Sequence, residues 1–210
     1  YTIPHFPVYL GCSTLPFKDD LFTDMSWWIS EGTGSIQLNP LIPLDILYQD
    51  QHNAVVGDIW KQHHYELANF IHKYHPQNVL EIGGAHGFLA SHYLKKELKA
   101  EWTIVEPNPN IVEGSSIKII KTFFDKKFPY SDNYDAIIHS HLIEHIYDPR
   151  EIVESIYNKI PLGCLHIFSL PNLHYMFDNY YTNSLNFEHT LFMSEPYVEA
   201  LLNNYGFVIE

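Results

Sequence analysis

Three glycines and two glutamates of this sequence stand where a ligand can be held. Gly83, Gly84 and Gly87 separate a short apolar run from a helical pattern, and a glycine turn lets a ligand approach the backbone closely. Glu81 precedes this turn. Glu106 ends the next apolar run, where a carboxylate can accept hydrogen bonds from both hydroxyls of a ribose. Because Gly-Gly-x-x-Gly departs from the dinucleotide fingerprint, a tight turn without a ligand stays open as the alternative.

A second group of residues suits proton transfer. Glu188 and His189 are adjacent, and a carboxylate beside an imidazole gives an oriented base that works near neutral pH. The connection that carries them follows a predicted strand, and such connections often hold functional residues. The alternative is a histidine that packs beneath Phe192.

The segment His141-Leu-Ile-Glu144-His145 matches the His-x-x-Glu-His signature of one class of zinc protease. That signature needs both histidines on one face of a sustained helix. Here a buried strand precedes the motif, and a new helix begins at Asp148-Pro149, with Asp148 as its N-cap. We therefore interpret His141 as a residue at a strand end beside the ligand and keep the metalloprotease as a rival.

The elements that must position these residues alternate between strand and helix, which predicts an α/β fold with a mostly parallel sheet. The predicted strands are residues 78–83, 102–106, 116–120, 134–139 and 164–170. The predicted helices are residues 58–75, 88–98, 148–160 and 194–205, with Gly206 as the last C-terminal cap. Residues 205–210 resemble the start of one more strand.

Composition bounds the function. The chain has 210 residues, 46% of them hydrophobic, and no apolar run long enough to span a bilayer. Its formal net charge of −13 argues against non-specific nucleic-acid binding. The only two cysteines, Cys12 and Cys164, lie far apart, and no signal peptide is visible, so we expect a cytoplasmic protein without disulfides. Fourteen histidines invite a metal-site interpretation.

The composition also shifts along the chain. Residues 1–57 are rich in proline, glycine and aromatic residues with little periodicity, whereas the alternating pattern occupies residues 58–210. We therefore predict a small, irregular N-terminal appendage followed by one larger domain.

The motifs of the larger domain together resemble class I S-adenosylmethionine (SAM) dependent methyltransferases. The similarity rests on the order of Glu81-x-Gly-x-x-x-Gly87, Val-Glu106-Pro, Tyr134 to Pro149 and Leu162 to Asn172, and it covers about residues 63–210. It implies a Rossmann-like sheet with SAM at the carboxyl ends of the strands and S-adenosylhomocysteine as product.

The resemblance also implies roles for individual residues. Gly83, Gly84 and Gly87 would flank the methionine part of SAM, with Glu81 just before them. Glu106 would hold the ribose. Phe124 or Asp125 would lie near adenine, and Ser140 would lie beside the cofactor.

Two further segments resemble sugar methyltransferases. The segment from Asn186 to His189 is similar to a Tyr-x-Glu-His element that supplies the base, with Asn186 in place of the tyrosine. Ser30 and Thr33 stand where a zinc-binding N-terminal module would have cysteines. Neither is a good zinc ligand, so we expect no bound metal. Residues 48–52 and 60–64 would lie where that family binds acceptors, and a polar helix face is the alternative for His63 and its neighbour.

The sequence therefore predicts a SAM-dependent methyltransferase for a small molecule. His189 is the first candidate for the base, oriented by Glu188, and His141 is the second. Oxygen is the expected acceptor atom because the tyrosine is absent. The resemblance suggests a nucleotide-activated sugar, or another precursor such as a phosphoramidate, of a bacterial surface or capsular polysaccharide. Rivals are a sugar C-methyltransferase, an NAD-dependent oxidoreductase and a non-catalytic binding module.

Overall fold

The structure is a computed structural model that describes residues 1–9, 20–47, 57–110, 116–130, 133–181 and 185–210. The chain forms two compact units. Unit 1 comprises residues 1–52, 143–153 and 171–210, and unit 2 comprises residues 53–142 and 154–170. The domain boundary predicted after residue 57 stays a prediction, and residues 48–56 beside it lie outside the described part of the chain.

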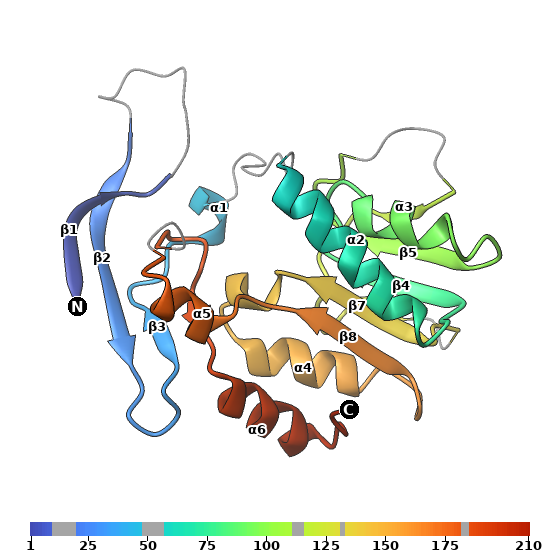
Figure 1. Ribbon diagram of the computed structural model, residues 1–210. Helices are drawn as coiled ribbons and strands as arrows, with labels where there is room; N and C mark the ends of the chain where they lie inside the picture. Colours follow the sequence, from blue (N-terminus) through green and yellow to red (C-terminus); the bar gives the residue numbers. More distant parts are fainter. Residues whose placement is uncertain (10–19, 48–56, 111–115, 131–132, 182–184) are drawn as a thin grey trace. The chain divides into compact units, whose positions relative to one another are not determined.

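Unit 2 is built on a five-stranded parallel sheet (Figure 1). Its strands, in sheet order, are β6 (Lys118–Ile120), β5 (Glu101–Val105), β4 (Asn78–Ile82), β7 (Ala136–Ser140) and β8 (Leu165–Ser169). Consecutive strands β4 and β5 are neighbours, but the chain then crosses over to place β7 on the other side of β4. Ligands of such sheets bind at the carboxyl ends of the strands where the order reverses, which here is the end of β4.

Helices α2 (Asp58–His72) and α3 (Phe88–Leu94) pack with the strands into the core of unit 2. The buried face of α2 is formed by Leu67, Ala68 and Ile71, which share one side of a helix because of their spacing. Pro76 follows the helix, and β4 begins two residues later. Trp102 and Tyr93 are the largest fully buried side chains of this core, and their rings lie 5.1 Å apart.

Unit 1 contains an antiparallel sheet made from both ends of the chain (Figure 1). Its order is β1 (Thr2–Pro7), β2 (Phe22–Ile29), β3 (Ile36–Leu38) and β9 (Leu191–Phe192). The unit also holds α1 (Leu44–Leu47), the 3-10 turn η2 (Ile143–His145), α5 (Leu173–Asp178) and α6 (Glu195–Tyr205). Helix α4 (Pro149–Tyr157) crosses from unit 1 into unit 2 along the chain.

The α/β fold with a mostly parallel sheet is confirmed, and so is each of its five predicted strands. Two local predictions are wrong. The helix predicted to reach residue 98 ends at Leu94, and residues 207–210 form no strand. A strand exists only when a neighbour pairs with it, and the described residues offer none to this segment. The N-terminal segment is also more regular than expected, because β2 is eight residues long. Within the described ranges, no helix is long and apolar enough to cross a membrane.

One buried hydrogen bond in unit 2 gives a stability prediction. The Tyr93 hydroxyl donates to the Pro76 carbonyl at 2.7 Å, beside the turn that leads into β4. Tyr93→Phe should lower the free energy of unfolding by about 1 kcal/mol, because it leaves a buried carbonyl without its donor. Urea unfolding measures the change. Tyr65→Phe, on an exposed ring of α2, is the matched control and should be neutral, and equal effects of the two changes would contradict the assignment.

Candidate cofactor site

The turn after β4 has the shape that its glycines predict. Gly83 and Gly87 have φ values of +76° and +68°, a left-handed conformation that favours glycine. The Gly83 N–H donates to the Val105 carbonyl at 2.9 Å, and the Gly87 N–H donates to the Gly84 carbonyl at 2.7 Å. The turn is therefore tied to the end of β5 and closed on itself at the sheet edge where ligands of this fold bind.

Gly84 is required for a second reason, which is close packing. A Cβ atom at this position would lie 2.8 Å from the Glu81 carboxyl carbon and 2.8 Å from Ile104 Cγ2. Real Cβ atoms do not approach other atoms so closely, and both neighbours are buried in the sheet. The missing side chain therefore leaves room for the Glu81 carboxyl beneath the turn.

Glu81 is unusual because it places a carboxyl group in the middle of the sheet, where the residue is only 3% exposed. The Trp102 indole N–H donates to its Oε2 at 2.8 Å. The pKa of the Glu81 carboxyl is raised to about 7, mainly by burial and also by the nearby charge of Glu106, while the Trp102 hydrogen bond opposes the shift. This group is half protonated near neutral pH and is held by one specific donor.

Glu106 directly follows β5, as predicted, and is half-buried. Its Oε1 accepts a hydrogen bond of 2.9 Å from the Asn108 N–H, and its own N–H donates to the Ile120 carbonyl of β6. Because β4 and β5 are adjacent and parallel, Glu106 and the glycine turn meet the same edge of the sheet. This is the geometry that the fold uses to hold a nucleoside.

Phe124 and Asp125 lie in the connection after β6. The Phe124 ring packs 5.2 Å from the Phe128 ring. The Asp125 carboxylate is exposed and accepts a hydrogen bond of 2.8 Å from the Lys127 N–H, which stabilises a local turn. Their predicted place near adenine stays a prediction.

The carboxyl ends of β7 and β8 carry a polar cluster. Ser140 Oγ lies 2.9 Å from Ser169 Oγ and 2.9 Å from His63 Nε2, which also lies 3.3 Å from Ser169 Oγ. The His141 ring packs edge to face against Trp60 and His63, with centroids 4.9 Å and 5.0 Å apart. The first half of α2 thus contributes side chains to the same sheet edge as the predicted Ser140 and His141.

Sequence reasoning does not name Ser169, and it expects residues 60–64 near the acceptor without predicting the contact of His63 with this edge. Burial, together with the neighbouring His141 and His64, lowers the pKa of His63 to about 4, so His63 is neutral at physiological pH. Two signals pointed to them: Ser169 is the last residue of a strand, and His63 follows Trp60 by nearly one helical turn. Neither signal states that the helix lies across the strand ends.

His189 and Glu188 belong to unit 1, in the connection before β9. The Asn186 Oδ1 accepts a hydrogen bond of 2.7 Å from the His189 N–H, and its Nδ2 lies 3.5 Å from His189 Nδ1. The His189 ring packs 4.9 Å from the His145 ring. Glu188 contributes its main-chain carbonyl, 3.0 Å from His145 Nδ1. The predicted role of its carboxylate in orienting His189 stays a prediction.

Ser30 and Thr33 form part of the hairpin turn between β2 and β3. The Ser30 carbonyl accepts a hydrogen bond from the Gly34 N–H at 2.9 Å, and Thr33 Oγ1 accepts one from the Ser35 N–H at 3.3 Å. These contacts are those of a polar turn. The resemblance to a zinc-binding module stays a hypothesis.

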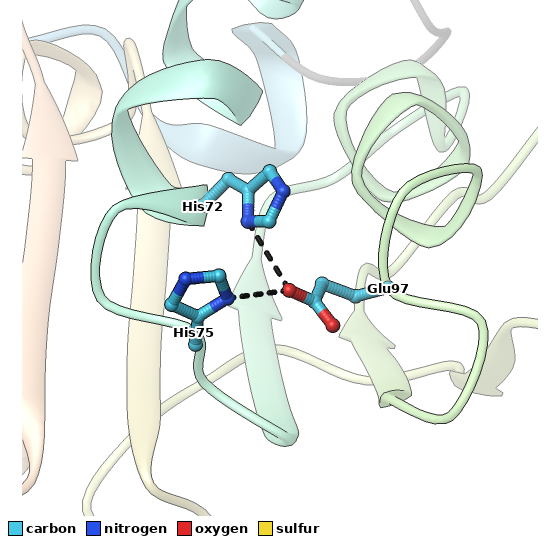
Figure 2. A group of neighbouring side chains, drawn as sticks. All are labelled: His72, His75 and Glu97. Carbon is cyan, nitrogen blue, oxygen red and sulfur yellow. Dashed lines mark hydrogen bonds and ion pairs between the residues drawn. The ribbon is translucent and has the colours of Figure 1, made fainter.

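A different cluster of histidine and carboxylate lies at the amino end of β4. Glu97 Oε1 lies 2.6 Å from His75 Nδ1 and 3.1 Å from His72 Nδ1, and Figure 2 shows the three side chains converging from α2, its following turn and the segment after α3. The hydrogen bond from His75 lowers the pKa of the Glu97 carboxyl.

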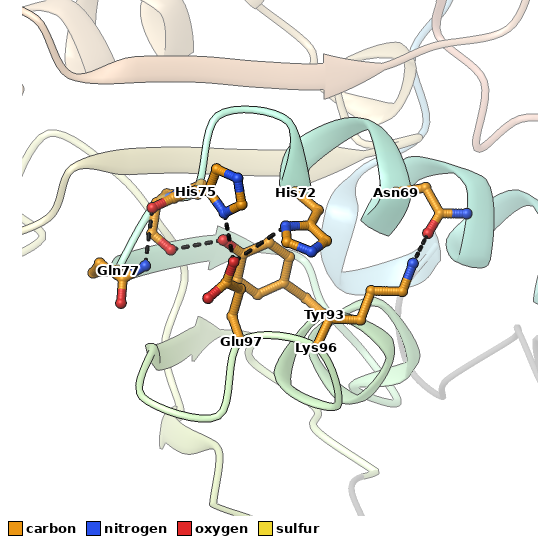
Figure 3. Close-up of polar contacts among 8 residues, drawn as sticks. Asn69, His72, His75, Gln77, Tyr93, Lys96 and Glu97 are labelled. Atoms are coloured by element: carbon orange, nitrogen blue, oxygen red, sulfur yellow. Dashed lines mark hydrogen bonds and ion pairs between the residues drawn. The ribbon is translucent and has the colours of Figure 1, made fainter.

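The surroundings of this cluster explain its shape. Figure 3 places Tyr93 beneath it, and the Gln77 side-chain amide donates to the His75 carbonyl at 3.0 Å. Lys96 and Asn69 form a hydrogen bond next to it. The contacts join the end of α2 to the segment after α3, at the end of the strand opposite to the glycine turn. This cluster is therefore not part of the cofactor edge.

Solved structures of methyltransferases share this fold. A candidate O-methyltransferase of Nostoc punctiforme is 16% identical over 71% of this chain and 51% of its own, with a TM-score of 0.55. A SAM-dependent methyltransferase of Thermotoga maritima is 19% identical over 72% of this chain and 76% of its own, with a TM-score of 0.53. The plantazolicin methyltransferase BpumL was solved with S-adenosylhomocysteine. It is 14% identical over 70% of this chain and 64% of its own, with a TM-score of 0.53.

The sheet and its crossover are thus those of the Rossmann-like class I methyltransferase fold. A model of the methyltransferase domain family matches residues 59–210, and the chain belongs to this family. No curated protein matches the sequence. The chain spans about half the length of the Nostoc punctiforme protein and about two thirds of BpumL.

The buried carboxyl gives a prediction for stability against pH. The pKa of Glu81 is about 7 in the folded chain, whereas the ordinary pKa of a glutamate is 4.5. At pH values between these two, the folded state binds more protons than the unfolded state. The stability of the wild type should therefore fall as pH rises, by roughly 2–3 kcal/mol between about pH 5 and about pH 8. Glu81→Gln keeps an acceptor for Trp102 and should remove this loss.

Urea unfolding across this pH range measures the difference between the two proteins. Glu101→Gln, at an exposed position of β5, is the matched control and should follow the wild type. An equal pH dependence in the Glu81→Gln protein would show that Glu81 does not titrate in this range.

Proposed function

We propose that the protein transfers a methyl group from SAM to a small molecule and releases S-adenosylhomocysteine. The observation that carries this proposal is the carboxyl edge of the parallel sheet. There the left-handed glycine turn after β4 and the carboxylate of Glu106 after β5 stand side by side. Membership of the methyltransferase domain family supports the same activity, and the fold shared with BpumL, which was solved with S-adenosylhomocysteine, supports the same cofactor.

In this proposal Gly83, Gly84 and Gly87 flank the methionine part of the cofactor, and the buried Glu81 supports the turn from below. Glu106 accepts hydrogen bonds from the ribose hydroxyls. Phe124 or Asp125 lies near adenine, and Ser140 lies beside the cofactor. The neutral His63 supports Ser140 by the hydrogen bond described above.

The sulfonium of SAM already activates the methyl group, so the protein has two tasks, which are to align the acceptor and to remove its proton. We assign the proton to the imidazole of His189, with Glu188 as its orienting partner and His141 as the second candidate. Asn186, which holds the His189 main chain, replaces the tyrosine of the carbon-methylating pattern. This replacement favours oxygen as the acceptor atom over carbon.

We further propose that the acceptor is a nucleotide-activated sugar, or another precursor such as a phosphoramidate, of a bacterial surface or capsular polysaccharide, and that the reaction takes place in the cytoplasm. The support is the resemblance of residues 30–38 and 186–194 to sugar methyltransferases. A sugar C-methyltransferase is the nearest alternative, and an NAD-dependent oxidoreductase or a non-catalytic binding module on the same sheet are the others.

The cofactor assignment predicts the effect of Gly83→Val. A side chain at φ +76° is strained, and its Cβ atom would lie 3.2 Å from Leu142 Cδ1, so the turn cannot keep its shape. We expect SAM and S-adenosylhomocysteine binding, measured by calorimetry, to be lost. Gly57→Ala, where a Cβ atom meets nothing within 4 Å, should bind as the wild type does. NAD serves as the negative ligand, and binding of NAD in preference to SAM would favour the oxidoreductase.

The catalytic assignment predicts the effect of His189→Ala. Transfer of a labelled methyl group to a panel of sugar nucleotides and capsule precursors should fall roughly 10²- to 10⁴-fold, while SAM affinity stays within about twofold. The product of the most active acceptor also identifies the methylated atom. Undiminished transfer would remove His189 from the mechanism, and binding of acceptors without any transfer would favour the non-catalytic module.

A further inference from the structure

The sequence motif His141-Leu-Ile-Glu144-His145 does not form the helix that a metalloprotease requires. Glu144 and His145 lie in the short 3-10 turn η2, and the chain then leads into α4. The same turn nevertheless brings Glu144 and His145 to His189 in unit 1. The ligand-type atoms of the three side chains all lie within 4.8 Å of one another.

Hydrogen bonds hold the two segments of this cluster together. The Thr190 N–H donates to the Glu144 carbonyl at 2.8 Å. The Thr190 hydroxyl, which is buried, lies 3.2 Å from the Glu144 carbonyl and 3.1 Å from the Ile146 carbonyl. Because none of these contacts uses the side chains of Glu144, His145 or His189, the fold brings these three side chains together independently of any contact among them.

The imidazole of His145 is oriented as metal ligands usually are. Its Nδ1 lies 3.0 Å from the Glu188 carbonyl, which can only accept a hydrogen bond. In the tautomer that donates from Nδ1 to this carbonyl, Nε2 has a lone pair for a metal ion. Metal-ligating histidines commonly donate their second N–H to a carbonyl in this way, which fixes the tautomer and the direction of the ring.

The charge of Glu144 points in the same direction. Glu144 is only 1% exposed. A carboxylate that is buried to this extent needs compensation of its charge. A divalent cation between the three groups would supply this compensation, and imidazole nitrogens and carboxylate oxygens are common ligands of such ions.

We propose that Glu144, His145 and His189 bind one divalent transition-metal ion. Two imidazoles and one carboxylate suit Zn²⁺, Mn²⁺ or Fe²⁺ better than Ca²⁺ or Mg²⁺, which prefer oxygen ligands throughout. Three protein ligands leave at least one coordination position open, as in catalytic sites. This departs from the expectation that the chain holds no metal, which rested on Ser30 and Thr33.

The inference rests on the proposed function in one respect, which is the role of His189. As a ligand, His189 acts on the acceptor through the cation, which lowers the pKa of a hydroxyl placed at the open position, so that the proton leaves to solvent. The loss of transfer expected for His189→Ala then has a second cause, and metal binding separates the two causes without reference to methyl transfer.

Metal binding to the chelator-treated, full 210-residue chain tests the proposal. Calorimetry with Zn²⁺ and elemental analysis after gel filtration should find one tightly bound ion. Co²⁺ should give the absorption bands of a low-coordinate nitrogen and oxygen site. Loss of a group that only hydrogen-bonds to a metal ligand weakens metal binding roughly 10- to 100-fold. His145→Ala and His189→Ala remove ligands themselves, so each should weaken binding by more than this.

His72→Ala is the matched control, because His72, His75 and Glu97 form the other group with metal-ligand chemistry among the described residues (Figure 2). Its change should leave the tight site and the Co²⁺ bands unchanged. Circular dichroism verifies that each variant is folded, and His189→Gln replaces His189→Ala if the latter is not. An ion that persists in both His145 and His189 variants, or no tight ion in the wild type, would overturn the proposal.

The two proposals fail in different ways. If chelation removes the ion and transfer continues at the full rate, the metal has no part in the reaction and the catalytic extension of this inference is wrong, whereas the methyltransferase stands. If one ion binds as described and no acceptor is methylated, the metal site stands and the proposed function is wrong. SAM binding should be the same with and without the ion.

Discussion

The buried hydrogen bond between the Trp102 indole and the Glu81 carboxyl is the contact on which the cofactor edge depends. It joins β4 to β5 through their side chains, at the strand pair whose ends carry the glycine turn and Glu106. Gly84 has no room for a side chain because this carboxyl and Ile104 lie directly beneath it. A polar group inside an apolar sheet thus leaves no room for a side chain at position 84, so the requirement for glycine there follows from packing.

The fourteen histidines of the chain are explained by their surroundings more than by their number. His139 and His166 lie on adjacent strands with their Nε2 atoms 3.0 Å apart, and burial lowers the pKa of both, so they are a neutral hydrogen-bonded pair within the sheet. His63 is neutral for the same reason at the carboxyl edge. His72 and His75 share one carboxylate at the opposite end. His63, His139 and His166 therefore serve as neutral polar residues that need no counter-charge, whereas His72 and His75 lie beside a carboxylate.

The fold could be predicted from the sequence because its signals are local. Apolar runs that end in Gly83, Glu106 or Pro171 identify strands, and their alternation with helices implies a parallel sheet. The polar cluster at the carboxyl edge could not be predicted fully, because the approach of His63 to Ser140 depends on how α2 crosses the strands. The segment after Gly206 was misread for a related reason: its composition suits a strand, but pairing depends on a neighbour that local sequence does not reveal.

The interpretation of residues 141–145 also depends on structure that the local sequence does not reveal. The His-x-x-Glu-His spacing has its usual meaning only on a helix, where it aligns two histidines, and a 3-10 turn separates them instead. What remains is Glu144 and His145, and their partner comes from a segment more than forty residues away, joined through Thr190. The residue types suggest metal chemistry here, whereas the spacing does not. The proposed ligand set depends on these two hydrogen-bonded segments, and Asn186 helps to position one of its members by holding the main chain of His189.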